Sequence, residues 1–259
     1  MFIKLADRII RIETMFPYIE EYCADYMIKD RTGGAEPDFG ICVLPEDIDF
    51  EREKSVREDM AEGNPVRHFS DEYLETLAVY RKIAEKMPDY DTFLFHGSAI
   101  SVDGTGYIFT AKSGTGKSTH TKLWRELFGN RAVMVNDDKP LIRIKAVADK
   151  NTDRGSSQAV VYGTPWDGKH RLSSPISIPV RAICILERGR ENRIDRIERS
   201  EAMPMLIQQS YRPQEPLALA KTLSLLDSLA ACVGLYRMEC NMNIEAAEMA
   251  YRTMQKTHC

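Results

Sequence analysis

The segment Thr110–Thr119, TAKSGTGKST, holds glycine, lysine and serine at a spacing that suits phosphate binding. An apolar run precedes it and a helical pattern begins within it, which is the context that a phosphate-binding P-loop requires. Ala111 stands where that pattern has its first glycine. Gly114 and Gly116 remain at the positions closest to a phosphate, where glycine is wanted for a positive φ. Two interpretations are open at this point, a nucleotide site and a glycine-rich turn capped by serine.

The same segment predicts how a nucleotide would be held. Successive backbone N–H groups of the loop can surround a phosphate, aided by the positive end of the helix that follows. The Lys117 ammonium would reach the β- and γ-phosphates, and the Ser118 hydroxyl would complete the coordination of a magnesium ion. The residues predicted to bind the nucleotide are Ser113, Gly114, Thr115, Gly116, Lys117, Ser118 and Thr119.

Two adjacent carboxylates follow the next apolar run, in VMVNDDKP. A P-loop needs a carboxylate across the site to hold the metal or its waters, usually at the end of a neighbouring strand. Asp137 and Asp138 stand about 20 residues after Lys117. Because adjacent residues of an extended chain point to opposite sides, one carboxylate could face the metal while the other orients it or meets the substrate. Taken alone, the same residues also fit an Asn-Asp turn before Pro140.

A second loop could supply positive charge. The stretch Tyr162–Ser174, YGTPWDGKHRLSS, combines glycine and proline breakers with basic residues. Phosphoryl transfer spreads negative charge over the γ-phosphate oxygens, and cations opposite the P-loop stabilise that charge. Lys169 and Arg171 are therefore candidate nucleotide-binding residues. An equally good interpretation is a solvated loop that Trp166 anchors on the core.

The elements that must position these residues alternate between strand and helix patterns. Strand patterns cover FLFHGSAISV, YIFTA, AVMVN, AVVYG, IPVRAICILE and LYRMEC, and Asp-Gly between the first two predicts a hairpin. Helical spacing follows in KSTHTKLWRELFG and in three later segments. The charged run ERGRENRIDRIERSE is interpreted as a hairpin at a solvated edge. Hairpins mixed with βα units predict an α/β fold with a mixed sheet flanked by helices.

The pattern of secondary structure that the sequence predicts changes near residue 90. Residues 1–90 have the patterns of short strands, an amphipathic stretch and a longer helix, DEYLETLAVYRKIAEKM, whereas strand-turn-strand patterns dominate afterwards. We therefore expect an N-terminal α+β lobe of unknown role over residues 1–90 and a nucleotide-binding domain over residues 91–259. One continuous domain is the alternative.

Taken in order, HGSAISVDGTGYIFTAKSGTGKST and VNDDKPLI resemble the HPr kinase/phosphorylases and their relatives, the nucleotide-binding half of the phosphoenolpyruvate carboxykinases. The likeness covers roughly residues 92–200. That superfamily combines a histidine-containing segment, a short hairpin, a P-loop and an acidic pair on the following strand. The resemblance implies the mixed-sheet P-loop fold of the HPr kinase C-terminal domain, with Mg²⁺-ATP as the phosphate donor.

The resemblance also implies residue roles. It assigns site functions to His96, which by itself is typical of a buried strand residue, and to Lys117, Ser118, Asp137 and Asp138. In enzymes similar to HPr kinase one carboxylate acts as the base toward the acceptor hydroxyl. By position this is Asp138, with Asp137 as its partner, and the inverse assignment stays open. Ser118 and the two aspartates are the predicted metal ligands.

Three departures from the resembled families shape the functional prediction. Thr119 stands where HPr kinases carry glutamate, whereas the carboxykinase loops also have threonine at this position. We find no segment for an oxaloacetate site, which argues against decarboxylation, and residues 1–90 do not resemble an HPr kinase regulatory domain. The predicted activity is ATP-dependent transfer of the γ-phosphate to a hydroxyl of a small molecule, a peptide or a protein. The alternatives are a non-catalytic ATP-binding regulatory module, and a phosphorylase or phosphatase that uses the same site.

Composition argues against several other classes. The 259 residues are 43% hydrophobic and 29% charged, with a net charge of −4, which is ordinary for a soluble protein and lacks a nucleic-acid footprint. The six cysteines show no metal-ligand spacing and predict free thiols. Charges interrupt both MFIKLADRII and LALAKTLSLLDSLAACVGL, unlike a signal peptide or a membrane span. We expect a cytoplasmic protein without nucleic-acid or membrane partners, either monomeric or oligomeric.

Overall fold

The chain divides into two compact units, Met1–Lys86 and Met87–Cys259. A computed structural model describes residues 1–29, 36–61, 63–147 and 156–256. Among the helices described, none is both long and apolar enough to cross a bilayer. The five cysteines within these ranges are free thiols, and Cys259 lies outside them.

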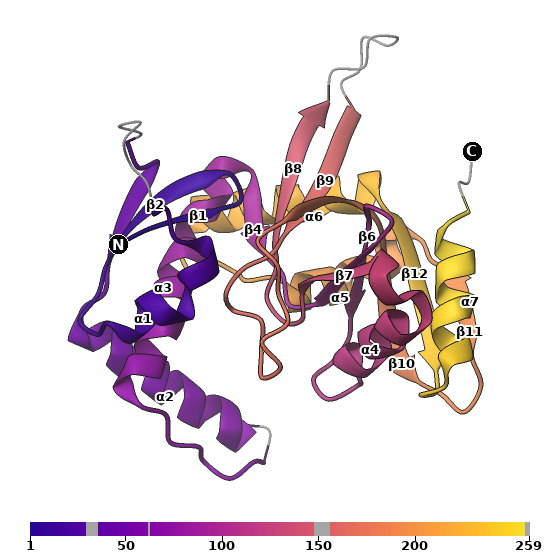
Figure 1. Ribbon diagram of the computed structural model, residues 1–259, viewed down its shortest axis with the longest axis horizontal. Helices are drawn as coiled ribbons and strands as arrows, with labels where there is room; N and C mark the ends of the chain where they lie inside the picture. Colours follow the sequence, from indigo (N-terminus) through magenta and orange to yellow (C-terminus); the bar gives the residue numbers. More distant parts are fainter. Residues whose placement is uncertain (30–35, 62, 148–155, 257–259) are drawn as a thin grey trace. The chain divides into compact units, whose positions relative to one another are not determined.

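The first unit contains a small three-stranded sheet (Figure 1). Strands β1 (Phe2–Leu5) and β2 (Arg8–Glu13) form an antiparallel hairpin, and β3 (Phe39–Cys42) pairs with β2 in parallel. Alternate residues of the hairpin, such as Ile3 and Ile10, are fully buried. The helices of this unit are α1 (Tyr18–Tyr22), the 3-10 turn η1 (Ala24–Tyr26), α2 (Pro45–Ala61) and α3 (Asp71–Lys86).

Helix α2 lacks the apolar spacing that usually predicts a helix. Its buried residues include two carboxylates, Glu51 and Asp59. Glu51 accepts a hydrogen bond of 2.6 Å from Arg81 of α3, and Asp59 pairs with Arg67 at 2.6 Å. Because paired carboxylates occupy positions that apolar side chains would otherwise fill, hydrophobic periodicity does not reveal this helix.

The second unit contains a nine-stranded mixed sheet. Its strands are β4 (Thr92–Leu94), β5 (Ser98–Val102), β6 (Thr105–Thr110), β7 (Ala132–Asn136), β8 (Leu141–Val147), β9 (Ser156–Tyr162), β10 (Ser177–Arg188), β11 (Arg193–Arg196) and β12 (Gly234–Cys240). The main order is β4-β8-β9-β10-β6-β5-β7, while β12 pairs with β10 and β11 pairs with β12. The start of β10 pairs antiparallel with β9, and its remainder runs parallel to β6 and β12. The predicted mixed sheet is therefore confirmed.

Helices cover both faces of this sheet. The 3-10 turns η2 (Met87–Tyr90) and η3 (Gly129–Arg131) accompany four longer helices, α4 (Lys117–Phe128), α5 (Arg199–Gln209), α6 (Pro216–Cys232) and α7 (Ile244–Met254). One face packs on α4 and α7 through a cluster that includes Phe109 and Trp124, and the other packs on α5 and α6 through a cluster that includes Ile108 and Leu206. Neighbouring residues of β6 thus enter opposite cores, as a strand covered on both sides requires. The α/β class predicted from the sequence is confirmed.

The segment FLFHGSAISV forms two strands and not the single strand that its pattern predicts. Strand β4 pairs with β8, whereas β5 pairs with β6 and β7. Between them, the His96 N–H donates to the Gln209 carbonyl at 2.7 Å and the Gly97 N–H donates to the Asp138 carbonyl at 2.9 Å. A Cβ at Gly97 would lie 3.1 Å from the Phe109 carbonyl oxygen, so the chain passes close to β6 here. His96 therefore lies in a break between strands.

Two predicted hairpins have opposite outcomes. The Asp-Gly hairpin is confirmed, because β5 and β6 are antiparallel and their turn residues Asp103 and Gly104 have φ of 51° and 76°. The hairpin predicted in ERGRENRIDRIERSE is wrong, because β11 pairs with β12 and not with β10. The more buried β12 occupies the edge of β10 that the charged segment would have used.

Candidate functional site

The Gly-rich loop, residues 111–116, connects β6 to α4 in the second unit. Gly114 and Gly116 have φ of 72° and 117°, a region that L side chains rarely adopt, so these glycines are required by the backbone. Within the described chain, the backbone N–H groups of Ser113, Gly114 and Gly116 donate no backbone hydrogen bond. Ala111 is fully buried in the cluster beneath α4, where its methyl group packs. The loop therefore presents free donors at the start of a helix, which is a favourable place for an anion.

Lys117 begins helix α4 and is partly buried. Burial lowers the pKa of its ammonium group, while the nearby Asp138 and Asp137 carboxylates act in the opposite direction. The side chain forms no ion pair within 4 Å among the residues that the structure describes. A half-buried ammonium group without a salt-bridge partner is costly, so an anion that binds beside it would be stabilised by pairing with it.

Asp137 is linked to the first turn of α4 by two hydroxyl groups. The Ser98 hydroxyl donates to Asp137 Oδ1 at 2.7 Å and lies 3.0 Å from the Thr121 hydroxyl oxygen. Thr121 in turn contacts the carbonyls of Lys117 and Ser118, each at 3.3 Å. This network, at the end of β7, places a buried carboxylate beside the helix start. Neither Ser98 nor Thr121 stood out in the sequence, because isolated hydroxyls on a strand and a helix carry no recognisable pattern.

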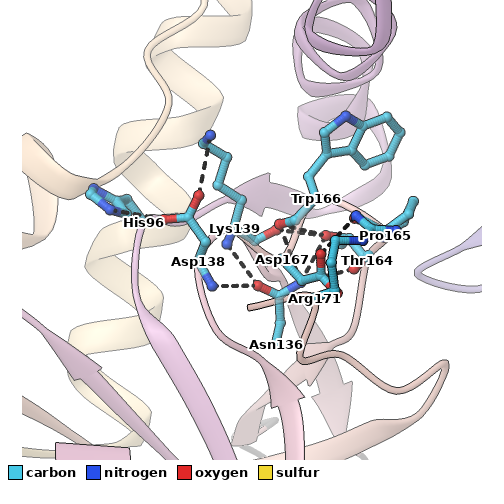
Figure 2. Close-up of polar contacts among 9 residues, drawn as sticks. All are labelled: His96, Asn136, Asp138, Lys139, Thr164, Pro165, Trp166, Asp167 and Arg171. Atoms are coloured by element: carbon cyan, nitrogen blue, oxygen red, sulfur yellow. Dashed lines mark hydrogen bonds and ion pairs between the residues drawn. The ribbon is translucent and has the colours of Figure 1, made fainter. Parts of the chain in front are cut away.

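Asp138 contacts two basic side chains, His96 and Lys139 (Figure 2). His96 Nε2 lies 3.2 Å from its Oδ1, and Lys139 Nζ lies 3.2 Å from its Oδ2. Burial on its own would raise the pKa of Asp138, but the hydrogen bond from His96 and the charge of Lys139 hold that pKa well below its ordinary value. The carboxylate therefore stays ionised at neutral pH. The adjacent Asp137 and Asp138 contact different partners.

Asn136 fixes the acidic segment to a second loop, as Figure 2 shows. Its fully buried Oδ1 accepts hydrogen bonds from the N–H groups of Asp138 and Lys139, at 2.8 and 2.7 Å. Its Nδ2 donates to the carbonyl and to the hydroxyl of Thr164, both at 3.0 Å. One side chain thus satisfies two backbone donors on one side and two acceptors on the other, so the two segments are held in register.

The two basic residues predicted on the second loop, Lys169 and Arg171, have different surroundings. Arg171 Nη1 pairs with Asp167 at 2.8 Å and donates to the Pro165 carbonyl at 2.6 Å, so this guanidinium is engaged within its own loop. Lys169 is exposed and has no hydrogen bond or ion pair among the described residues. Trp166 is 2% exposed and does anchor the loop.

Asp167 is a buried carboxylate that the sequence analysis missed. It is 2% exposed, and it accepts a hydrogen bond from the Ser173 hydroxyl at 2.8 Å in addition to the Arg171 pair. Burial raises its pKa, and the charge of Asp137 acts in the same direction, so the two carboxylates lie near one another. Beside it, a Cβ on Gly168 would lie 3.2 Å from the Asp138 Cβ. The loop therefore passes directly against the acidic pair.

Arg188, at the end of β10, also contacts the Gly-rich loop. Its guanidinium donates a hydrogen bond to the Gly114 carbonyl. This residue lies in the charged run that the sequence analysis assigned to a solvated edge, and the contact joins positions 74 residues apart. Local sequence patterns carry no signal for such a contact.

Comparisons with known proteins find a distant similarity among solved structures and no match to a protein family or a curated protein. No protein family matches the chain, and no curated protein matches it. Among solved structures, the HPr(Ser) kinase/phosphatase from Coxiella burnetii is similar at 15% sequence identity and a TM-score of 0.23, over 52% of this chain and 96% of that one. A similarity at this level carries no argument about function.

Proposed function

We propose that the second unit is an ATP-dependent kinase that transfers the γ-phosphate of ATP to a hydroxyl group of a small molecule, a peptide or a protein. The observation that carries the proposal is the network of Ser98, Asp137 and Thr121, which ties a buried carboxylate to the first turn of the helix behind the Gly-rich loop. A phosphate cradle and an acidic group at one site are the parts that phosphoryl transfer requires.

The Gly-rich loop would bind the phosphates. Free N–H groups of the loop and the ammonium of Lys117 would stabilise the charge of the β- and γ-phosphates. Ser113, Gly114, Thr115, Gly116 and Thr119 belong to this cradle in the proposal. Lys169 is the further cation available to the γ-phosphate, because it is exposed on the loop beside the acidic pair, whereas Arg171 shapes that loop through Asp167.

The carboxylate oxygens of Asp137 and Asp138 and the hydroxyl oxygen of Ser118 are of the ligand type that magnesium prefers. This ion is usually held by one or two carboxylates together with substrate phosphates. Asp137 and Asp138 both act on the charge of Lys117, so they lie near the start of α4, where Ser118 contributes a hydroxyl. No group of three His, Cys, Asp or Glu side chains within the described ranges could hold a metal by itself. We therefore assign Asp137, Asp138 and Ser118 to a site that is complete only with the phosphates, where bound magnesium would neutralise phosphate charge.

Asp138 would act on the acceptor. It is ionised and, at 26% exposure of its side chain, still accessible, so it can accept a hydrogen bond from the acceptor hydroxyl and take its proton as the phosphate transfers. His96 would orient the carboxylate through their 3.2 Å contact, and Lys139 would hold its second oxygen. Asp137, which is more deeply buried, serves as the partner on the metal side.

The proposal is tested by incubating the protein with magnesium, γ-labelled ATP and fractionated metabolites and proteins. Lys117→Ala and Asp138→Asn should each reduce transfer by about 100-fold or more. Lys122→Ala, at an exposed position of the same helix, is the matched control and should transfer normally.

Normal transfer by either site variant would show that the mechanism is wrong. ATP binding by the wild type without transfer to any acceptor would instead support a regulatory nucleotide-binding module. Phosphate-dependent removal of phosphate from a labelled acceptor would support a phosphorylase.

A further inference from the structure

Residues 167–171 of the second loop form a turn, and this 167–171 turn lies against the side chain of Asp138. A Cβ on Gly168 would lie 3.2 Å from the Asp138 Cβ and 3.6 Å from its Cγ. Gly168 has a φ of 73°, which L side chains rarely adopt. The turn can therefore approach Asp138 this closely because residue 168 is glycine.

This approach limits where the Asp138 side chain can point. Its two carboxylate oxygens contact His96 Nε2 and Lys139 Nζ, each at 3.2 Å. Those two side chains are partly exposed, so they can follow a carboxylate that moves. The backbone of Gly168, which lies beside the Asp138 methylene group, cannot follow unless the whole turn moves. The position of the turn is therefore the more rigid restraint on the direction of the carboxylate.

The side chain of Arg171 holds the 167–171 turn, as Figure 2 shows. Arg171 Nη1 donates to Asp167 Oδ1 at 2.8 Å and to the Pro165 carbonyl at 2.6 Å. Asp167 is 2% exposed, and its other oxygen accepts from the Ser173 hydroxyl at 2.8 Å. The backbone of Arg171 has a φ of 51°, a left-handed conformation that a residue with a Cβ keeps only when its surroundings fix it. The pair with the buried Asp167 supplies this constraint.

Both flanks of the turn are fixed independently of Arg171. On one side the Thr164 hydroxyl donates to the backbone carbonyl of the residue after Asp138 at 2.8 Å. On the other side the Ser174 N–H donates to a carbonyl of β7 at 3.2 Å. The backbone hydrogen bond across the turn itself, from the Arg171 N–H, is long at 3.4 Å. Loss of the Arg171 side chain would therefore release the centre of the turn and leave its ends in place.

We propose that Gly168 and Arg171 are positioning residues for the base of phosphoryl transfer. Arg171 holds the 167–171 turn through Asp167, and the turn directs the Asp138 carboxylate toward the acceptor hydroxyl. The inference rests on the proposed function, because it takes Asp138 as the base. It differs from the prediction that Arg171 binds the nucleotide, since a cation that contacts phosphate in the bound state changes ATP affinity, whereas a positioning residue changes the rate of transfer.

The first test compares two glycines that have nearly the same φ. Gly168→Ala adds a methyl group that must displace the Asp138 side chain by a few tenths of an ångström, whereas Gly104, with a φ of 76°, has nothing within 4 Å of an added Cβ. Transfer is measured with magnesium, γ-labelled ATP and the metabolite or protein fraction that the wild type labels most. Gly168→Ala should lower kcat by about tenfold and leave KM for ATP within about twofold. Gly104→Ala has the same backbone strain and should transfer at the wild-type rate.

The second test is a double-mutant cycle of Arg171→Gln and Asp167→Asn. Each single variant should lower kcat by about tenfold, and the double variant should be no slower than the slower single variant, because both substitutions break the same pair. ATP binding without magnesium should be unchanged in all three. Urea unfolding of the free protein gives a readout apart from activity, since the double variant should lose less stability than the two single losses added together. The cycle decides the matter if Gly168→Ala does not fold.

Three results would overturn the inference. Transfer by folded Gly168→Ala at the rate of Gly104→Ala would remove the role of the turn and leave the kinase proposal standing. Weaker ATP binding by Arg171→Gln, with additive losses in the double variant, would return Arg171 to the nucleotide site and also leave the kinase proposal standing. Wild-type protein that labels no fraction would overturn the proposed function and this inference with it.

Discussion

The side chain of Asn136 allows a quantitative test of how the site is held together. Asn136→Ala removes the acceptor of two backbone N–H groups, at Asp138 and Lys139, and the donor to Thr164. Both donors are partly buried, and a fully buried donor left without a partner costs about 1–3 kcal/mol. With partial relaxation of the segment, we expect the free energy of unfolding to fall by about 2–4 kcal/mol.

Urea unfolding followed by tryptophan fluorescence measures this loss. Both tryptophans of the chain, Trp124 and Trp166, lie in the second unit, so their emission reports on that unit alone. Asn130→Ala changes an exposed asparagine that precedes the start of β7 and should alter stability by less than about 0.5 kcal/mol.

The same variant distinguishes binding from transfer. Binding of ATP without magnesium to the Gly-rich loop should be nearly retained in Asn136→Ala, because the loop is held by other contacts, while magnesium-dependent phosphate transfer should fall steeply as the acidic pair loses its position. A loss of stability below about 1 kcal/mol would refute the claim that Asn136 joins the two segments. Equal losses of ATP binding and of phosphate transfer would refute the claim that Asn136 is needed for transfer and not for binding.

Two further predictions concern the backbone and the charge of the site. Gly116→Ala places a side chain at φ 117°, a strain of about 1–3 kcal/mol, so ATP binding should weaken by about tenfold or more in titration calorimetry, while Lys112→Ala beside it should bind normally. His96→Ala removes a hydrogen bond that lowers the pKa of Asp138, so the acid limb of the pH–rate profile should move to higher pH, whereas His170→Ala should leave it in place. The stability that ionised Asp138 contributes is fully present above the pKa of Asp138 in the unfolded chain, and it is lost as pH falls through its lower pKa in the folded protein. Because His96→Ala raises that folded pKa, acid unfolding of this variant should begin at a higher pH than in the wild type. An unmoved acid limb would contradict the role given to His96.

Local patterns predicted much of the second unit because its strands and helices obey simple rules. The apolar run of β6, the glycines after it and the amphipathic α4 place the loop unambiguously, and the Asp-Gly turn specifies the hairpin before it. Positive φ at Gly114 and Gly116 agrees with the reason for which glycine was expected there.

Long-range contacts account for what the sequence did not reveal. The break at His96 and Gly97 exists because both backbone N–H groups bond outside the sheet, to residues far along the chain. Asp167 lies in the loop that the sequence analysis selected for its cations. Nothing in the local sequence indicates that this carboxylate is buried or that it binds Arg171. Helix α2 was missed because its buried face is partly charged.

The double pairing of β10 has a consequence for synthesis on the ribosome. Strand β10 ends at Arg188, but the strand that covers its second edge, β12, begins only at Gly234. At about 5–20 residues per second, a nascent chain spends a few seconds with that apolar edge unpaired. An open edge of this kind is a template for aggregation until β12 pairs with it. Premature termination between these strands would leave the edge permanently exposed.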